Sequence, residues 1–136
     1  MEVGKEIEET IVTILKKTIS PSTIYIFGSY VKGNMRSDSD IDIAFLSKKG
    51  IDDYERFMLA QEIADKLGRN VDLIDLNKAS TVFQAQIVGI GKTIYCINPL
   101  KRMNFEMVAL KMYAKLNEER KEIIDRIKES GEVYET

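Results

Sequence analysis

A Gly-Ser pair followed, after ten intervening residues, by Asp-x-Asp is the feature that most constrains how this sequence can fold. The pair is Gly28-Ser29, and the two acids are Asp40 and Asp42. An apolar run, Thr23–Phe27, ends at the pair, and a second apolar run begins between the acids. The pattern predicts two buried strands, Thr23–Phe27 and Asp40–Leu46, joined by a helical turn and a polar loop.

The two acids predict a cation site beside a phosphate site. Residues two apart in a strand point to the same face, so the carboxylates of Asp40 and Asp42 converge. Carboxylates held that close repel each other unless cations lie between them, and Mg²⁺ prefers such oxygen ligands. Backbone N–H groups at the start of the turn at Ser29 are suited to phosphate. Together these features outline a nucleoside-triphosphate site.

A third acid comes from the run Val71–Leu76, which reads as another strand. Asp72 and Asp75 have opposite parity in it, so only one of them can join the other carboxylates. We favour Asp72, and expect Asp75 to end the strand or cap a helix. Three carboxylates from two strands could hold two metal ions, with Asp72 helping to remove the proton of an acceptor hydroxyl.

Further residues near the pair could contact the triphosphate. Gly28 lets a phosphate approach the backbone, and Ser29 offers an N–H and a hydroxyl. Ser39 either binds a phosphate oxygen or caps the loop. Lys32 and Arg36 either offset triphosphate charge or are simply solvated.

Two other ion- and phosphate-binding motifs do not fit. In a calcium loop counted from Asp38, the sixth position is Ile43 instead of Gly and the twelfth is Lys49 instead of Glu. Around Gly91–Thr93 a P-loop would need a glycine where Gln86 stands, and the order is helix then strand.

Composition limits the chemistry further. The length of 136 residues predicts one domain over residues 1–136. The net charge of −2 gives no indication of non-specific binding to nucleic acid or membranes. The lack of histidine excludes Ser-His-Asp and Cys-His catalysis. The one cysteine, Cys96, fits a reducing cytoplasm. No apolar stretch approaches the roughly 20 residues that span a membrane, and the first residues are too acidic for a signal peptide.

The remaining elements complete an α/β (α+β) fold, a small mixed sheet flanked by helices. We expect a first helix ended by Pro21, a helix from Asp52 or Asp53 to Leu67, and a helix over about Lys78–Val88. Thr93–Ile97 reads as an edge strand. A long C-terminal helix begins near Pro99, and residues 131–136 form a flexible tail. The apolar stripe of this last helix, which we expect to pack mainly on the core, consists of Phe105, Val108, Met112, Leu116, Ile123 and Ile127.

These motifs resemble the DNA-polymerase-beta-type nucleotidyltransferases, and more narrowly the minimal nucleotidyltransferases (MNT). The signature of that superfamily is matched by Gly28-Ser29 with Asp40-Ile41-Asp42, and its later acidic element by Val71-Asp72-Leu73. The stretches LAQEIADKLGRNVDLIDLNKAST and MYAKLNEERKEIIDRI are similar to the antitoxin subfamily of MNT proteins, the partners of HEPN toxins. The resemblance covers most of the chain.

The resemblance implies transfer of AMP from ATP to a tyrosine hydroxyl of a cognate HEPN ribonuclease, which blocks the toxin. It makes Asp40, Asp42 and Asp72 ligands of Mg²⁺, with two ions expected, and Gly28-Ser29 the triphosphate contact. A hetero-oligomer with the toxin is expected, without membrane or direct nucleic-acid contact. The chain departs from many relatives in having Tyr30, where they have Arg.

Two alternatives stay open. The chain could be a non-catalytic antitoxin that inhibits its toxin by direct binding, or a subunit of a small-molecule nucleotidyltransferase. The absence of an obvious acceptor domain argues against the second, and leaves the polar face of the last helix available for a partner.

Overall fold

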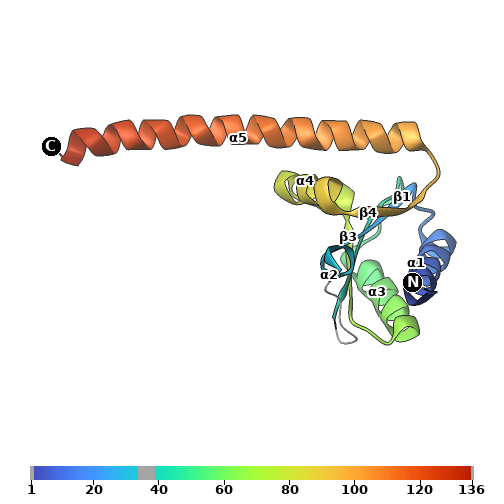
Figure 1. Cartoon of the computed structure of the whole chain (residues 1–136). Helices are drawn as coiled ribbons and strands as arrows, with labels where there is room; N and C mark the ends of the chain where they lie inside the picture. Colours follow the sequence, from blue (N-terminus) through green and yellow to red (C-terminus); the bar gives the residue numbers. More distant parts are fainter. Residues whose placement is uncertain (1, 34–38, 136) are drawn as a thin grey trace.

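The structure is a computed structural model that describes residues 2–33 and 39–135. In chain order, the elements are α1 (Glu2–Thr18), β1 (Thr23–Phe27), α2 (Ser29–Lys32), β2 (Ile41–Leu46), α3 (Asp53–Leu67), β3 (Val71–Asp75), a 3₁₀ turn (Leu76–Lys78), α4 (Thr81–Ile90), β4 (Lys92–Cys96) and α5 (Pro99–Glu135). Figure 1 shows a small body from which α5 projects. The predicted α/β class, with a sheet flanked by helices, is confirmed.

The four strands form one mixed sheet in the order β3-β2-β1-β4. β1 pairs antiparallel with β2 and with β4, whereas β2 pairs parallel with β3. β4 is therefore an edge strand, as predicted. The parallel pair matters most for function, because it sets Asp42 directly opposite Asp72.

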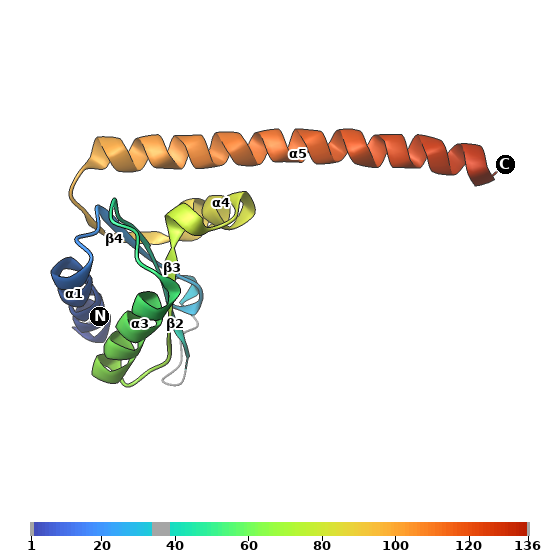
Figure 2. The same ribbon diagram turned by 180° about the vertical axis from the view of Figure 1, so that it is seen from behind.

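Helices cover both faces of the sheet, and strand alternation divides the core accordingly. On β2, Ile41, Ile43 and Phe45 belong to the larger apolar cluster, which α1 and α3 complete. Ala44 and Leu46 belong to a second cluster, which includes Ile87 of α4 and contacts Phe105 of α5. Figures 1 and 2 show α1 and α3 on one side of the sheet and α4 and α5 on the other. Asp42 shares the parity of the second set and so faces α4.

Most predicted boundaries are correct because local signals set them. The Asp52 side chain accepts a hydrogen bond of 2.7 Å from Glu55 N–H and caps α3, and Gly68 ends that helix at φ 65°. The helix predicted over about Lys78–Val88, ending at Gly89 and Gly91, begins later than expected, and its end is confirmed at Gly91, whose N–H bonds to the Ile87 carbonyl. Leu76–Lys78 form a 3₁₀ turn instead, the Ser80 hydroxyl caps α4 by accepting from Phe83 N–H, and α4 continues past Gly89.

The strands differ from prediction by one residue at several ends. β2 begins at Ile41, so Asp40 lies just before the strand instead of in it. β3 ends at Asp75, and Leu76 opens the 3₁₀ turn. β4 runs from Lys92 to Cys96, one residue earlier than predicted.

The last helix, α5, begins at Pro99 as predicted, and its N-terminal part lies along α4 (Figures 1 and 2). Phe105 contacts the second apolar cluster, and Ala109 is buried. The expectation that its apolar stripe is mainly core packing is wrong, because much of the stripe is exposed: Val108, Met112, Ile123 and Ile127. The helix continues to Glu135, into the segment where the sequence predicts a flexible tail. Across the described residues, no helix combines the length and the apolar character that a membrane crossing requires.

Candidate active site

Strand register brings two of the predicted acids together. Asp42 of β2 and Asp72 of β3 are direct partners in the parallel pair, so both side chains lie on the α4 face of the sheet. On the other side of β2, Asp42 is the partner of Phe27, the last residue of β1. The ring of Phe27 meets that of Phe83 edge-on, with centroids 5.8 Å apart, and so brings α4 close to this end of the sheet.

The Gly-Ser turn lies directly against Asp42. Gly28 has φ 74° and ψ −142°, a backbone conformation that only glycine adopts without strain. A β-carbon at this position would collide with the Asp42 carboxylate. Gly28 also accepts hydrogen bonds from Val31 N–H and Lys32 N–H at 3.2 Å, which close the short helix α2. The predicted adjacency of the turn and the acids is therefore present.

The electrostatics of Asp42 reflect its neighbours. Burial raises the pKa of the Asp42 carboxyl above its ordinary value, and the negative charges of Asp72 and Asp40 raise that pKa further. Asp42 is half-buried, whereas Asp40 and Asp72 are exposed. Both neighbouring carboxylates therefore lie close enough to repel Asp42, which is the most enclosed of the three.

The donor set is suited to a hard cation. Adjacent strands lie about 4.8 Å apart, so carboxylates at paired positions can reach one Mg²⁺, whose oxygen ligands lie about 2.1 Å from it. Among residues 2–33 and 39–135, no three acidic or cysteine side chains are gathered closely enough to hold a metal ion. The arrangement is thus a facing pair, by which we mean that Asp42 and Asp72 lie side by side on the same face of the sheet, with Asp40 next to them. The predicted two-ion site stays a prediction.

The other predicted residues occupy different places. Ser29 opens α2 and is half-buried, Lys32 ends α2 and is exposed, and Ser39 is half-buried immediately before Asp40. Asp75 faces the opposite side of the sheet from Asp72 and is only 7% exposed. Its carboxylate accepts a 3.0 Å hydrogen bond from Asn77 N–H, which confirms the predicted capping role.

Two residues of the segment between the Gly-Ser turn and the acids, Arg36 and Asp38, lie outside the described residues. A contact between Arg36 and the triphosphate therefore stays a prediction from the sequence.

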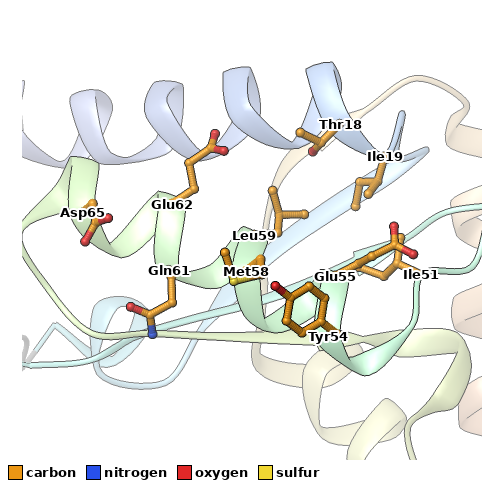
Figure 3. Close-up of a pocket in the computed structure, with 10 residues that line it drawn as sticks. All are labelled: Thr18, Ile19, Ile51, Tyr54, Glu55, Met58, Leu59, Gln61, Glu62 and Asp65. Carbon is orange, nitrogen blue, oxygen red and sulfur yellow. The ribbon is translucent and has the colours of Figure 1, made fainter.

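A pocket of about 470 Å³ lies away from these residues, between the end of α1 and α3. Figure 3 shows Thr18 and Ile19 on one side of it, and Tyr54 and Met58 of α3 on the other. None of the predicted site residues lines this pocket. It lies over the α1 and α3 face of the sheet, whereas Asp42 and Asp72 lie on the α4 face, so this pocket is separate from the candidate active site.

One polar network beside the Gly-Ser turn has no counterpart in the sequence-based expectations. Tyr30 of α2 donates a hydrogen bond of 2.5 Å to the Glu8 carboxylate of α1, and Lys92 of β4 donates to the same oxygen at 2.7 Å. Burial, the hydrogen bond to Glu8 and the Glu8 charge raise the pKa of Tyr30 to about 12. No local sequence pattern predicts this network, because its members come from three elements, α1, α2 and β4, that are distant in sequence.

Comparison with known proteins gives a consistent picture. The sequence model of the polymerase beta nucleotidyltransferase family matches residues 9–100. The chain is 39% identical to the protein adenylyltransferase MntA of Shewanella oneidensis over 121 residues, which is 88% of this chain and 86% of that protein.

Solved structures agree. A toxin–antitoxin structure with AMP-PNP is similar at 39% identity, with a TM-score of 0.81, covering 88% of this chain and 97% of the other. A tri-AMPylated Shewanella oneidensis HEPN toxin in complex with an MNT antitoxin is similar at 36% identity, with a TM-score of 0.78, covering 91% and 98%.

Proposed function

The chain belongs to the polymerase beta nucleotidyltransferase family, and from that premise we propose that it is a protein adenylyltransferase that neutralises a HEPN toxin. It would transfer AMP from ATP to a tyrosine hydroxyl of the toxin and release pyrophosphate. The single observation that carries this proposal is the facing pair Asp42 and Asp72, with Gly28 packed against the Asp42 carboxylate.

The residues have separate roles in this reaction. The turn at Gly28-Ser29 holds the triphosphate through backbone N–H groups and the Ser29 hydroxyl. Asp42 and Asp72, with Asp40 beside them, would hold Mg²⁺, in a two-ion arrangement as expected for such carboxylates. When bound, Mg²⁺ supplies charge neutralisation at the phosphates and lowers the pKa of the acceptor hydroxyl.

Asp72 is suited to the acceptor side. It is exposed on β3, whereas Asp42 is half-buried between β1 and β3. An incoming hydroxyl can therefore approach Asp72 from solvent, and its carboxylate can hold the proton that leaves the oxygen. Ser39 and Lys32, at either side of the loop, are proposed as further contacts to the phosphates.

The partner completes the site. The similar antitoxin structures are of toxin–antitoxin assemblies, one of them with an AMPylated HEPN toxin, which supports a HEPN protein as acceptor for this chain and a hetero-oligomer as the working form. The single cysteine, which leaves no disulfide within the chain, supports a cytoplasmic location for this protein.

Labelled ATP tests the proposal. The chain is incubated with Mg²⁺, ATP labelled in the α-phosphate and the cognate HEPN protein, and label on the toxin is measured. We expect labelled toxin with the wild type and none with Asp40→Asn/Asp42→Asn or after EDTA, whereas Asp65→Asn on the exposed side of α3 should label normally. Absence of label while the two proteins associate, or full neutralisation by the double variant, would favour inhibition by contact alone.

A further inference from the structure

The short helix α2, which carries the Gly-Ser turn, touches the apolar core only through the partly buried ring of Tyr30. It comprises only Ser29–Lys32, and none of its residues is fully buried. A single helical turn is unstable in isolation, because nucleating a helix is unfavourable. Something outside α2 must therefore fix the direction in which the backbone of Gly28 and Ser29 points.

Tyr30 links α2 to Glu8 of α1, on the side of α2 away from the acids, and we call this link the tether. The ring of Tyr30 packs against the apolar cluster formed by α1, α3 and the sheet, and its hydroxyl lies 2.5 Å from the Glu8 carboxylate and 3.2 Å from the Gly4 carbonyl. Both contacts join α2 to α1. Because a hydroxyl has one proton, the bond to the charged Glu8 carboxylate is the dominant one.

Lys92 fixes the acceptor of that hydrogen bond. Its ammonium group lies 2.7 Å from the same Glu8 oxygen and 5.9 Å from the centre of the Tyr30 ring. Lys92 begins β4, where its partner on β1 is Ile26, two residues before Gly28. The Glu8 carboxylate is thus held both by Lys92 of the sheet and by Tyr30 of α2.

The space around the tether is tight on the α1 side. A β-carbon at Gly4 would lie 2.9 Å from the Tyr30 hydroxyl oxygen, closer than real contacts of this kind. A methyl group there would push the Tyr30 side chain without touching Gly28, Asp42 or Asp72. The chain therefore offers a remote way to disturb the tether.

We propose that Tyr30, held by Glu8 and Lys92, is a positioning residue that orients the Gly28–Ser29 turn for the triphosphate. This inference rests on the proposed function, since it names how the same nucleotide site is held in shape. Tyr30 sits next to Ser29 in the chain, so a tilt of its side chain is transmitted to the N–H groups of the turn. The role is one of alignment, with no contact between the Tyr30 hydroxyl and the nucleotide.

Nucleotide binding tests this separately from catalysis. Dissociation constants for AMP-PNP with Mg²⁺ are measured by calorimetry on the full chain, beside KM and kcat for transfer. Tyr30→Phe should weaken AMP-PNP binding and raise KM for ATP by up to about tenfold, because the energy of one hydrogen bond to a charged group limits how far its loss can misalign the turn. Gly4→Ala should weaken binding similarly, while the better helix propensity of alanine offsets part of the stability lost with the displaced Tyr30 contact.

Matched variants separate alignment from general damage. Glu8→Gln keeps an oxygen that accepts from Tyr30 and should bind AMP-PNP within about twofold of wild type, whereas Glu8→Ala should resemble Tyr30→Phe. Tyr54→Phe, at a 71% exposed site on α3, should change nothing. In the double variant Tyr30→Phe/Glu8→Ala the losses should not add, because both remove one interaction.

The outcomes are distinct. Unchanged AMP-PNP binding in both Tyr30→Phe and Gly4→Ala overturns the positioning role, whatever the transfer assay gives. If the wild type binds AMP-PNP but never labels the toxin, the proposed function fails, while weaker binding in these variants still supports the tether. Should Tyr30→Phe not fold, Gly4→Ala alone decides the question.

Discussion

The α-carbon of Gly28 faces the carboxylate of Asp42 so closely that no other side chain can be placed between them. Gly28 is also held at φ 74°. Glycine is therefore required here for two independent reasons, backbone conformation and contact with an acid. The site depends on this approach, because it sets phosphate-binding N–H groups beside a cation-binding carboxylate.

Gly28→Ala should therefore abolish most activity. Strain at this backbone conformation should lower the free energy of unfolding by about 1–3 kcal/mol, and displacement of Asp42 should lower the transfer rate at least about 100-fold. Thermal unfolding and labelled-ATP transfer measure the two effects. Gly50→Ala is the matched control, since a β-carbon at Gly50 meets nothing within 4 Å. A Gly28→Ala protein with normal transfer would contradict the assigned geometry.

Asp42→Asn should separate stability from activity. Burial and the charges of Asp72 and Asp40 raise the pKa of Asp42, so the ionised carboxylate is unfavourable in the folded protein. Removing the charge should leave the unfolding temperature unchanged or higher, while transfer falls at least about 100-fold because a cation ligand is lost. Unfolding is measured without added nucleotide or metal, and transfer is measured with Mg²⁺. A large drop in unfolding temperature would argue that Asp42 has a structural role instead.

Asp75→Ala tests the assignment of Asp72 over its neighbour. Asp75 is buried on the opposite face and accepts from Asn77 N–H, so its loss should lower the free energy of unfolding by about 0.5–2 kcal/mol, as for other caps. Transfer by the folded protein should stay within about twofold of wild type, whereas Asp72→Asn should remove it. Urea unfolding and the labelling assay measure the contrast. Asp75→Asn, which keeps an acceptor oxygen, should restore most of the lost stability.

Features set by interactions between near neighbours in the chain could be predicted from the sequence. Alternation along Val71–Leu76 is enough to put Asp72 and Asp75 on different faces, and Asp52 and Gly68 mark the ends of α3 locally. The start of α4 differs from the prediction because Asp75 accepts a hydrogen bond from Asn77 N–H and caps a separate 3₁₀ turn, which interrupts the helical pattern. The distant contacts of α1, α2 and β4 depend on how packed elements meet, which residue spacing does not encode.

The ion pair of Glu8 should give stability that depends on pH. Burial alone would raise the pKa of Glu8, but hydrogen bonds from Lys92 and Tyr30, with the Lys92 charge, lower it below its ordinary value of 4.5. A lowered folded-state pKa means that the contribution is present above pH 4.5 and is lost as pH falls through the folded-state value. The free energy of unfolding of the wild type should exceed that of Glu8→Gln by up to about 1 kcal/mol at about pH 7, and the difference should shrink as the pH falls below 4.5.

Denaturant unfolding at several pH values measures this difference. Glu62→Gln, at an exposed position on α3, is the control and should show no such closing difference. A difference between wild type and Glu8→Gln that stays constant from about pH 7 to about pH 3 would place the effect outside the ion pair.

Tyr25→Phe should loosen the attachment of α5 to the sheet. Tyr25 is 1% exposed, and its hydroxyl donates a 2.7 Å hydrogen bond to Glu106 of α5, whose carboxylate also lies 3.6 Å from Arg102. Burial, followed by the bond to Glu106 and its charge, raises the pKa of Tyr25, so the hydroxyl stays protonated and can donate at neutral pH. Phenylalanine fills the same space but leaves the carboxylate with Arg102 alone. The free energy of unfolding should fall by about 1–3 kcal/mol, as for other bonds to charged groups.

A double-mutant cycle isolates that bond. Tyr25→Phe and Glu106→Gln are measured singly and together by urea unfolding, with the exposed Tyr54→Phe as control. The coupling energy should exceed about 0.5 kcal/mol, because the two groups are in direct contact. A coupling near zero would mean that α5 is held by the apolar contacts of Phe105 and Ala109, with the hydroxyl adding nothing.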